Sequence, residues 1–210
     1  MFRRLLNNKI GNILVYIAEE CSPLYMTKGL KLLYLIDERA VRLSGSPITW
    51  LDYKVWKNGP VAEELYQELR YNQVLTFGEQ RLSLDEFLII ERHSNHKNQE
   101  QVDVKLLPKQ KTDFSKFSDF EIKIVHSIVE KYGNLSSSQL IDVLHQQGTH
   151  WHEIVEKHNL QAHFTLKGNT SDYMIDFIDL IEDDEILSSS ARSSYEALAF
   201  QENLLNFAFV

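Results

Sequence analysis

One segment constrains the fold more than any other, because it joins two amphipathic helix patterns through a strong break. It runs from Leu32 to Leu69 and reads LLYLIDERAVRLSGSPITWLDYKVWKNGPVAEELYQEL. Gly59 can adopt backbone angles that other residues avoid, whereas Pro60 fixes its own φ and lacks an N–H group. Proline is favoured in the first turn of a helix, where this donor would stay unpaired anyway. The sequence therefore predicts that Pro60 opens a helix after a turn-rich loop.

The two helices expected around this break differ in their patterns. In the first, from Thr27 as N-cap to about Leu43, apolar residues wrap around more than one face, which indicates a buried central helix. In the second, over residues 60–71, apolar side chains recur every four residues on one face. The intervening ITWLDYKVW is rich in β-branched and aromatic residues, which favours a short strand or an extended crossing segment.

The rest of the chain predicts further helices and one β-hairpin. Ser118 and Glu121 have capping-box spacing at the start of a helix that ends at Gly133. The other expected elements are a helix over 2–20, hairpin strands over 87–92 and 102–107 with the loop HSNHKNQE between them, a helix from Ser136 or Ser137 to about Gly148, an acidic helix from Ser171 or Asp172 to about Leu187, and a final helix within 195–210. This pattern predicts a mainly α fold: a compact helical domain over residues 1–160 with a small β-hairpin, and an acidic C-terminal helical extension over residues 161–210.

Composition places the chain among ordinary globular proteins and shows where its charge lies. The 210 residues are 43% hydrophobic and 25% charged, and no run of about 18 apolar residues predicts a membrane span. Cys21 is the only cysteine, so no internal disulfide is expected and a cytoplasmic location is favoured. Residues 1–110 hold 15 Lys/Arg and 14 Asp/Glu, whereas residues 111–210 hold 7 and 16. The acidic second half disfavours binding to nucleic acid and favours a basic partner.

The order of short motifs resembles one known family, the SocA-like (Panacea) antitoxin domain. Its members carry a KLLYL helix, a Gly-x-Pro-Ile step, an aromatic-rich segment that ends in GPV, an LY pair, and a later block with leucine, histidine and tryptophan. This chain has KLLYL from Lys31, Gly45-Ser46-Pro47-Ile48, and LIDVLHQQGTHW over residues 140–151, so the resemblance covers roughly residues 10–155. The resemblance implies a structural role for the motif residues Trp56, Gly59, Pro60, Val61, Leu65, Tyr66, His145 and Trp151.

No residue pattern in the chain predicts catalysis, a cofactor or a metal. Five histidines crowd the region from His145 to His163, but a helical zinc pair needs two histidines four residues apart around a glutamate. His150 and His152 instead point to different helix faces. Cys21 follows two glutamates, which oppose thiolate formation, and neither a nucleophile elbow nor a phosphate loop is present. We therefore expect no catalytic residue, no bound cofactor and no metal ligand, although the histidines could form a pH-responsive patch.

The acidic segment is the best candidate for a binding site outside the resemblance. Residues 172–185 hold seven acidic side chains and neither Lys nor Arg. An ordinary amphipathic helix would dock on its own domain, whereas a partner-binding helix would use apolar anchors framed by charge. Both can hold if each face binds one surface. The candidate partner contacts are Asp172, Asp176, Phe177, Asp179, Leu180 and Asp183.

The resemblance implies that the chain is the antitoxin of a bacterial or phage toxin–antitoxin system. Such a protein binds a cognate toxin, expected here to be basic, and either masks it or delivers it to a cellular protease. Two alternatives remain at this point: an interaction module of a phage or mobile element without a toxin, and an enzyme that acts on a small molecule. A small neighbouring reading frame that is toxic when expressed alone would favour the antitoxin.

Overall fold

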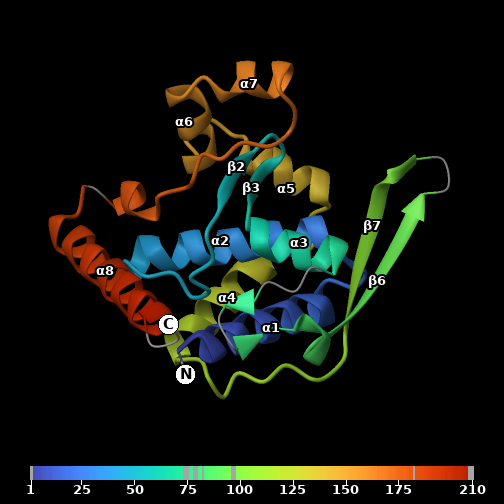
Figure 1. The fold of residues 1–210 in the computed structure, drawn as a ribbon, viewed down its shortest axis with the longest axis horizontal. Helices are drawn as coiled ribbons and strands as arrows, with labels where there is room; N and C mark the ends of the chain where they lie inside the picture. The colour runs from blue at the N-terminus through green and yellow to red at the C-terminus, as the bar shows by residue number, and fades with distance from the viewer. Residues whose placement is uncertain are drawn as a thin grey trace.

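The computed structural model describes residues 2–72, 76–77, 80–81, 83–95, 98–181 and 183–207, with side chains over 5–72, 83–93, 102–181 and 183–200. Its helices surround one central helix, and its strands form small antiparallel sheets (Figure 1). The predicted mainly α fold with small β elements is therefore confirmed. Among the described helices, none is both long and apolar enough to cross a membrane.

The central helix is α2 (Met26–Ser44), and it is buried around most of its circumference, as its apolar pattern predicts. It packs against α1 (Phe2–Glu20), α4 (Asp119–Tyr132) and α5 (Ser137–Leu144). The predicted N-cap was wrong: the helix already begins at Met26, and Tyr25 in the N-cap position offers no capping side chain.

The predicted β-hairpin is confirmed and is longer than expected. Strands β6 (Leu88–Asn95) and β7 (Asn98–Pro108) pair antiparallel, and β1 (Leu24–Tyr25) adds to the other edge of β7. Much of the expected loop HSNHKNQE is strand, because residues 93–95 and 98–100 continue the ladder. The lower part of the hairpin lies against α1, and its upper part projects from the body (Figure 1).

Pro60 does not open a helix, which corrects the expectation from its sequence context. Gly59 and Pro60 lie in strand β3 (Gly59–Val61), which pairs with β2 (Lys54–Trp56). Helix α3 (Glu63–Tyr71) begins after this hairpin, with Ala62 as its N-cap. Pro60 faces Val55 in the ladder, and the N–H of Val55 donates instead to a third segment on the far side of β2. The missing donor of proline is thus tolerated here.

Local capping signals are borne out in the helices that follow. The capping box of Ser118 and Glu121 starts α4, and a second one, of Ser136 and Gln139, starts α5. Helix α5 ends at Leu144, four residues before the expected stop. Helices α6 (His150–Lys157) and α7 (Leu160–Leu166) complete this part of the fold. The remaining short elements are β4 (Thr76–Phe77), β5 (Gln80–Arg81) and the 3₁₀-helix η1 (Leu84–Glu86).

The expected acidic helix from residue 172 to 187 is wrong. Residues 172–176 are extended, a short 3₁₀-helix η2 (Phe177–Ile181) follows, and α8 (Glu185–Phe207) begins only at Glu185. Like charges four residues apart oppose a helix, and the edge of β2 offers this segment backbone partners instead. The proposed boundary at residues 160 and 161 stays a prediction and falls within α7.

Candidate functional site

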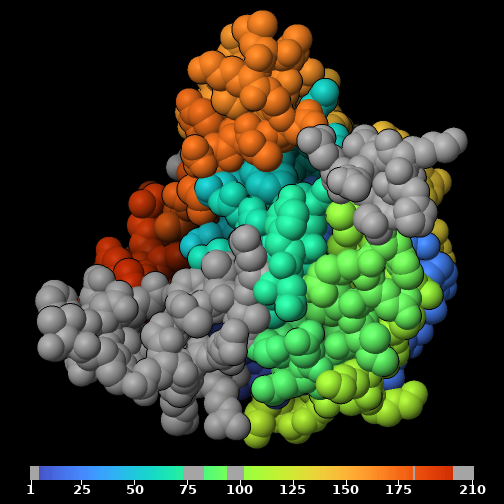
Figure 2. Space-filling view, turned by 45° about the vertical axis from the view of Figure 1, so that its right-hand side comes forward, coloured from blue at the N-terminus to red at the C-terminus, as the bar shows by residue number. Residues whose placement is uncertain are grey.

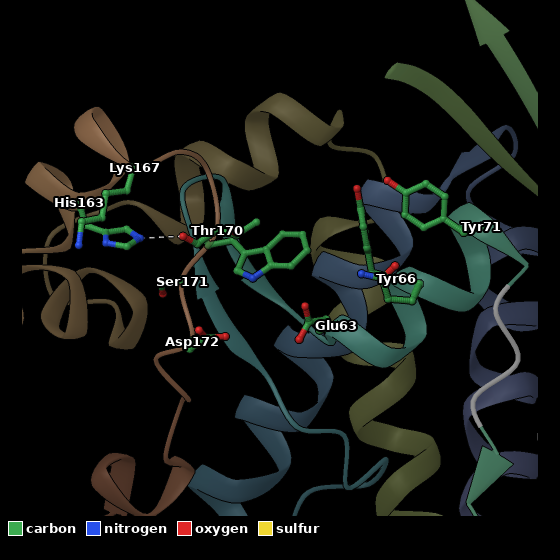
Figure 3. Close-up of a pocket in the computed structure, with 10 residues that line it drawn as sticks. Glu63, Tyr66, Tyr71, His163, Lys167, Thr170, Ser171 and Asp172 are labelled. Atoms are coloured by element: carbon green, nitrogen blue, oxygen red, sulfur yellow. Dashed lines mark hydrogen bonds between the residues drawn. The ribbon is translucent and has the colours of Figure 1, made fainter. Parts of the chain in front are cut away.

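An open groove of about 440 Å³ lies between α3, β2 and the segment that follows α7. In the space-filling view, the orange surface of residues around 160–175 stands above the cyan and teal surface of β2, β3 and α3 (Figure 2). The close-up shows Tyr66 and Tyr71 on the α3 side, with Thr170 to Asp172 facing them (Figure 3). The groove is lined by Trp56, Glu63, Tyr66, Gln67, Tyr71, His163, Lys167, Thr170, Ser171 and Asp172.

One wall of the groove is aromatic. The rings of Trp56 and Tyr66 meet edge to face at 5.0 Å, and Tyr71 meets Tyr66 at 6.4 Å. The guanidinium of Arg70 lies 5.7 Å and 5.4 Å from these two tyrosine rings. Tyr71 is 53% exposed, so this wall offers an apolar surface that water still covers. Tryptophan, tyrosine and arginine are the side chains enriched in the strongest contacts of protein interfaces.

At the lip of the groove, Lys54 forms ion pairs with two carboxylates, Glu63 and Asp172. Its Nζ lies 2.6 Å from Glu63 Oε2 on α3 and 2.9 Å from Asp172 Oδ1 on the opposite segment. The hydrogen bond from Lys54 lowers the pKa of Asp172, and those to Glu63 and Asp172 raise the pKa of Lys54. Lys54 and Asp172 therefore stay charged near neutral pH, and Lys54 bridges the two walls of the groove.

Behind the aromatic wall, the later motif block holds the β2–β3 hairpin in place. The indole Nε1 of Trp151 donates to the carbonyl of Trp56 at 3.0 Å. The ring of His145 stacks on Trp151 at 3.9 Å and is nearly parallel to it. Burial, and then the nearby Lys31, lowers the pKa of His145, so this ring is neutral at pH 7. These two motif residues thus lie under the groove and do not line it.

A buried lysine supports the tip of the same hairpin. The side chain of Lys31 comes from α2, is 2% exposed, and donates from Nζ to the carbonyl of Pro60 at 2.8 Å. Gly59 has a φ of +98°, and a Cβ there would lie 3.1 Å from Lys31 Nζ. Burial lowers the pKa of Lys31 to about 7. The amine of Lys31 is therefore only partly protonated at neutral pH.

A second buried network organises the loop that leads into β2. The carboxylate of Asp37 is fully buried on α2, and its Oδ1 accepts from the N–H groups of Ile48 at 2.8 Å and Thr49 at 2.9 Å. Its Oδ2 accepts from the hydroxyls of Thr49 and Tyr53. Burial raises the pKa of Asp37 to about 6, although these hydrogen bonds pull it down.

The segment opposite α3 pairs with the edge of β2 through backbone hydrogen bonds and one isolated antiparallel bridge, between Lys54 and Met174. We call residues 169–181 the strap. The N–H groups of Lys57 and Val55 donate to the carbonyls of Asn169 and Tyr173, and the N–H of Ile175 donates to the carbonyl of Tyr53, each at 2.8 Å. The strap then turns inward at η2, and its first half forms the second wall of the groove.

The structure separates the six predicted partner contacts. Asp172 lies in the lip of the groove, whereas Asp179 and Asp183 are exposed farther along the chain. Asp176 accepts from the N–H of Ile178 at 2.9 Å and starts η2. Leu180 is half-buried against the core. The four aspartates therefore do not share the face of one helix, and their contact with a partner stays a prediction.

Phe177, the predicted anchor for a partner, packs inside its own chain. It is 4% exposed, and its ring lies 5.7 Å from the rings of both Tyr34 and Tyr53. It cannot contact a partner while the strap is docked in this way. The Phe177 ring already packs between the rings of these two tyrosines, a site that we call the aromatic slot.

The structure distributes the remaining motif residues between groove and core. Trp56 and Tyr66 line the groove, whereas Gly59, Pro60, Val61 and Leu65 are buried beneath it. Sequence reasoning missed Lys31, Asp37, Glu63 and Tyr71. The sequence could have indicated Lys31 and Asp37, because a lysine and an aspartate within a helix predicted to be buried must find partners in the core. The groove residues carried no such local signal.

The five clustered histidines lie in separate surroundings. His150 Nε2 is 2.9 Å from the carbonyl of Asp176, His163 Nε2 is 2.9 Å from that of Thr170, and His158 lies against Tyr173. Across the described residues, no three His, Cys, Asp or Glu side chains are grouped so that they could hold a metal ion. The absence of bound metal stays a prediction that elemental analysis can test.

Replacing Lys31 by methionine should change how stability depends on pH. The pKa of Lys31 is lower in the folded chain than the ordinary value of about 10.4, so the stability linked to it is full above that value and is lost as pH falls through about 7. Wild type should therefore gain up to roughly 1.4 kcal/mol of unfolding free energy per pH unit between pH 7 and 10, relative to Lys31→Met. Urea denaturation at each pH measures this difference. Lys28→Met, on the same helix, is the control, and equal slopes for wild type and Lys31→Met would contradict the prediction.

Comparison with known proteins identifies the part of the chain that supplies the aromatic wall of the groove. A family model described as "Antitoxin SocA-like, Panacea domain" matches residues 30–152, which is more than half of the chain. The match covers most of α2, the β2–β3 hairpin, α3 and Trp151, and it ends before the strap. No curated protein and no solved structure matches the chain.

Proposed function

The chain belongs to the antitoxin SocA-like, Panacea domain family, and from this premise we propose that it neutralises a cognate toxin by binding it. Masking of the toxin and delivery to a protease both begin with this complex. The proposed role needs no catalytic step and no cofactor, and it places the protein in the cytoplasm with its toxin.

The observation that carries the proposal is the composition of the groove. Its aromatic wall combines the family motif residues Trp56 and Tyr66 with the exposed Tyr71. Its opposite wall comes from the strap and from His163 and Lys167 just before it, all outside the matched region. A groove built in this way combines a surface from the family region with one specific to this chain, which suits recognition of one particular toxin.

Charge favours a basic toxin. Asp172 lies in the lip, and Asp176, Asp179 and Asp183 are exposed along the chain beyond it. The second half of the chain carries all of the net negative charge of −8, because basic residues slightly outnumber acidic ones in the first half. Such a surface steers a positively charged protein toward the groove and repels nucleic acid.

Two sets of variants should affect toxin binding in different ways. Asp176→Asn/Asp179→Asn/Asp183→Asn should slow association several-fold and flatten its dependence on salt, because exposed charges act mainly on encounter. Tyr71→Ala should speed dissociation about tenfold or more with little change in association, because it removes an aromatic contact from the groove wall. Surface plasmon resonance at several salt concentrations, with the product of the neighbouring reading frame as toxin, measures both.

A matched control removes the same amount of charge elsewhere. Glu20→Gln/Asp103→Asn/Glu130→Gln changes three exposed carboxyl groups on α1, β7 and α4, away from the groove. If both triple variants slow association equally, the acidic strap and its surroundings do not steer the toxin. If Tyr71→Ala dissociates like wild type and still protects cells during co-expression, the groove is not the contact surface.

A truncation after Leu166 would not test the extension cleanly. It would remove Phe177 from its slot and expose Tyr34 and Tyr53, which are 0% and 1% exposed in the full chain. If the truncated chain no longer protected cells from the toxin, the cause could be unfolding as readily as loss of contacts with the toxin. Full-length variants at exposed positions avoid this ambiguity.

A further inference from the structure

The strap is bound to the rest of the molecule as a peptide ligand is bound to a receptor. Its backbone pairs with the outer edge of β2 through three hydrogen bonds of 2.8 Å, and the hydroxyl of Ser171 donates to the carbonyl of Val55. Addition of an extended segment to the edge of a sheet is a common mode of peptide recognition. Backbone pairing supplies affinity in this mode, and side-chain pockets supply selectivity.

The side chains in the second part of the strap alternate as those of an added strand do. Ile175 and Phe177 are buried, whereas Met174 and Asp176 are exposed. Ser171 is also buried, but Tyr173 between Ser171 and Ile175 is 44% exposed and lies against His158, so the alternation begins only at Met174. Phe177 ends the pattern in the aromatic slot, where it stacks on Tyr34 and meets Tyr53 edge to face. The edge of β2 and the aromatic slot therefore bind a short extended segment that has an aromatic anchor at its C-terminal end.

The docking site and its occupant come from different parts of the chain. Tyr34, Tyr53, Val55 and Lys57 all lie within the region that the family model matches, whereas residues 169–181 lie beyond it. The connection is an exposed turn at Gly168, where φ is +113° and a Cβ would meet no atom within 4 Å. A short tether of this kind keeps the strap at a high effective concentration near its site.

We propose that the edge of β2 and the slot between Tyr34 and Tyr53 form a peptide-docking site that the strap occupies reversibly in cis. Because Thr170, Ser171 and Asp172 of the docked strap form one wall of the groove, docking of the strap builds the toxin-binding surface. This second statement rests on the proposed function. Strap docking and toxin binding then strengthen each other, since coupling between two binding events is reciprocal.

A peptide supplied in trans tests the docking site without any toxin. The full-length Phe177→Ala chain has a weakened strap, so a fluorescent peptide of residues 168–183 should bind it at least tenfold more tightly than it binds wild type, whose site is filled. The same peptide with Phe177→Ala should bind at least tenfold more weakly to the variant chain. Fluorescence anisotropy measures all four combinations. Equal affinity of both peptides, or equal binding to both chains, would overturn the proposal.

A cleavable chain decides the question if Phe177→Ala does not fold. A protease recognition sequence inserted between Gly168 and Asn169 allows the strap to be cut from its tether after folding. The fluorescent wild-type peptide should then exchange into the cut chain and not into the uncut chain. Failure to enter the cut chain would show that the strap is a fixed part of the core, which overturns reversible docking.

The coupling to toxin has its own readout. Phe177→Ala should bind toxin at least tenfold more weakly than wild type, and excess wild-type peptide should restore most of this loss. Peptide docking without restored toxin binding would overturn the coupling while leaving the docking site intact. Failure of wild type itself to bind the toxin would instead count against the proposed function, so the two failures are distinguishable.

Discussion

Asp37→Ala is expected to lower the free energy of unfolding by at least about 3 kcal/mol, because each buried donor left without an acceptor costs about 1–3 kcal/mol. The substitution leaves the N–H groups of Ile48 and Thr49 without their acceptor, and neither group can turn toward another one. The hydroxyls of Thr49 and Tyr53 lose the same carboxylate. For a chain of this length, the melting temperature should fall by roughly 6–12 °C. Thermal and urea denaturation at pH 7 measure both quantities.

Asp37→Asn is the matched control, because its amide oxygen can still accept from both backbone N–H groups. It should lose less than half as much stability as Asp37→Ala. The buried carboxyl has a raised pKa of about 6, so the stability linked to its titration is full below about pH 4 and is lost as pH rises through about 6. Wild type should therefore lose stability relative to Asp37→Asn over this range. Equal stability of the alanine and asparagine variants would show that the network does not hold the loop before β2.

Gly59→Val is expected to lower the free energy of unfolding by about 2–6 kcal/mol, because strained backbone costs roughly 1–3 kcal/mol and crowding in a packed core costs about as much. The φ of +98° is unfavourable for any residue with a Cβ, and most of all for a β-branched one. A Cβ would also lie 3.1 Å from Lys31 Nζ, which is closer than ordinary contact, and the methyl groups of valine would extend beyond it. Differential scanning calorimetry of the variant measures the loss.

Gly148→Val separates the two parts of this cost. Gly148 has a similar φ of +84°, but no atom lies within 4 Å of the place that its Cβ would take. It should therefore show the backbone cost alone and be clearly more stable than Gly59→Val. An unchanged melting temperature for Gly59→Val would mean that the β2–β3 turn does not need glycine, and equal losses in both variants would rule out crowding against Lys31.

The elements that sequence predicts well here are those whose signals are local. The capping boxes at Ser118 and Ser136 decide where α4 and α5 begin, because each is completed within four residues. The apolar residues of α2 lie around most of its circumference, and this pattern within one segment identifies it as the central helix. Hairpin strands β6 and β7 follow from two apolar runs that lie close together along the chain.

The elements that sequence misplaces depend on residues far away in the chain. Pro60 lies in a strand because β2 pairs with β3 and because Lys31 binds its carbonyl. Residues 172–176 are extended because the edge of β2 accepts them, although their composition resembles a helix. The groove is assembled from three such segments, so neither Glu63 nor Tyr71 could be assigned to it from spacing alone.

The strap also determines when the molecule can finish folding. Its hydrogen bond from Ile175 to Tyr53 and its ring contact between Phe177 and Tyr34 close very long loops around the central part of the fold. During synthesis, α2 and the β2–β3 hairpin emerge long before these partners exist, so the slot between Tyr34 and Tyr53 is exposed to water until residues 175–177 arrive. Contacts this distant in sequence form slowly, because the entropy cost of closing the loop arises before the contacts stabilise the fold. The nascent chain therefore acquires its complete groove only after residues 170–172 have been synthesised.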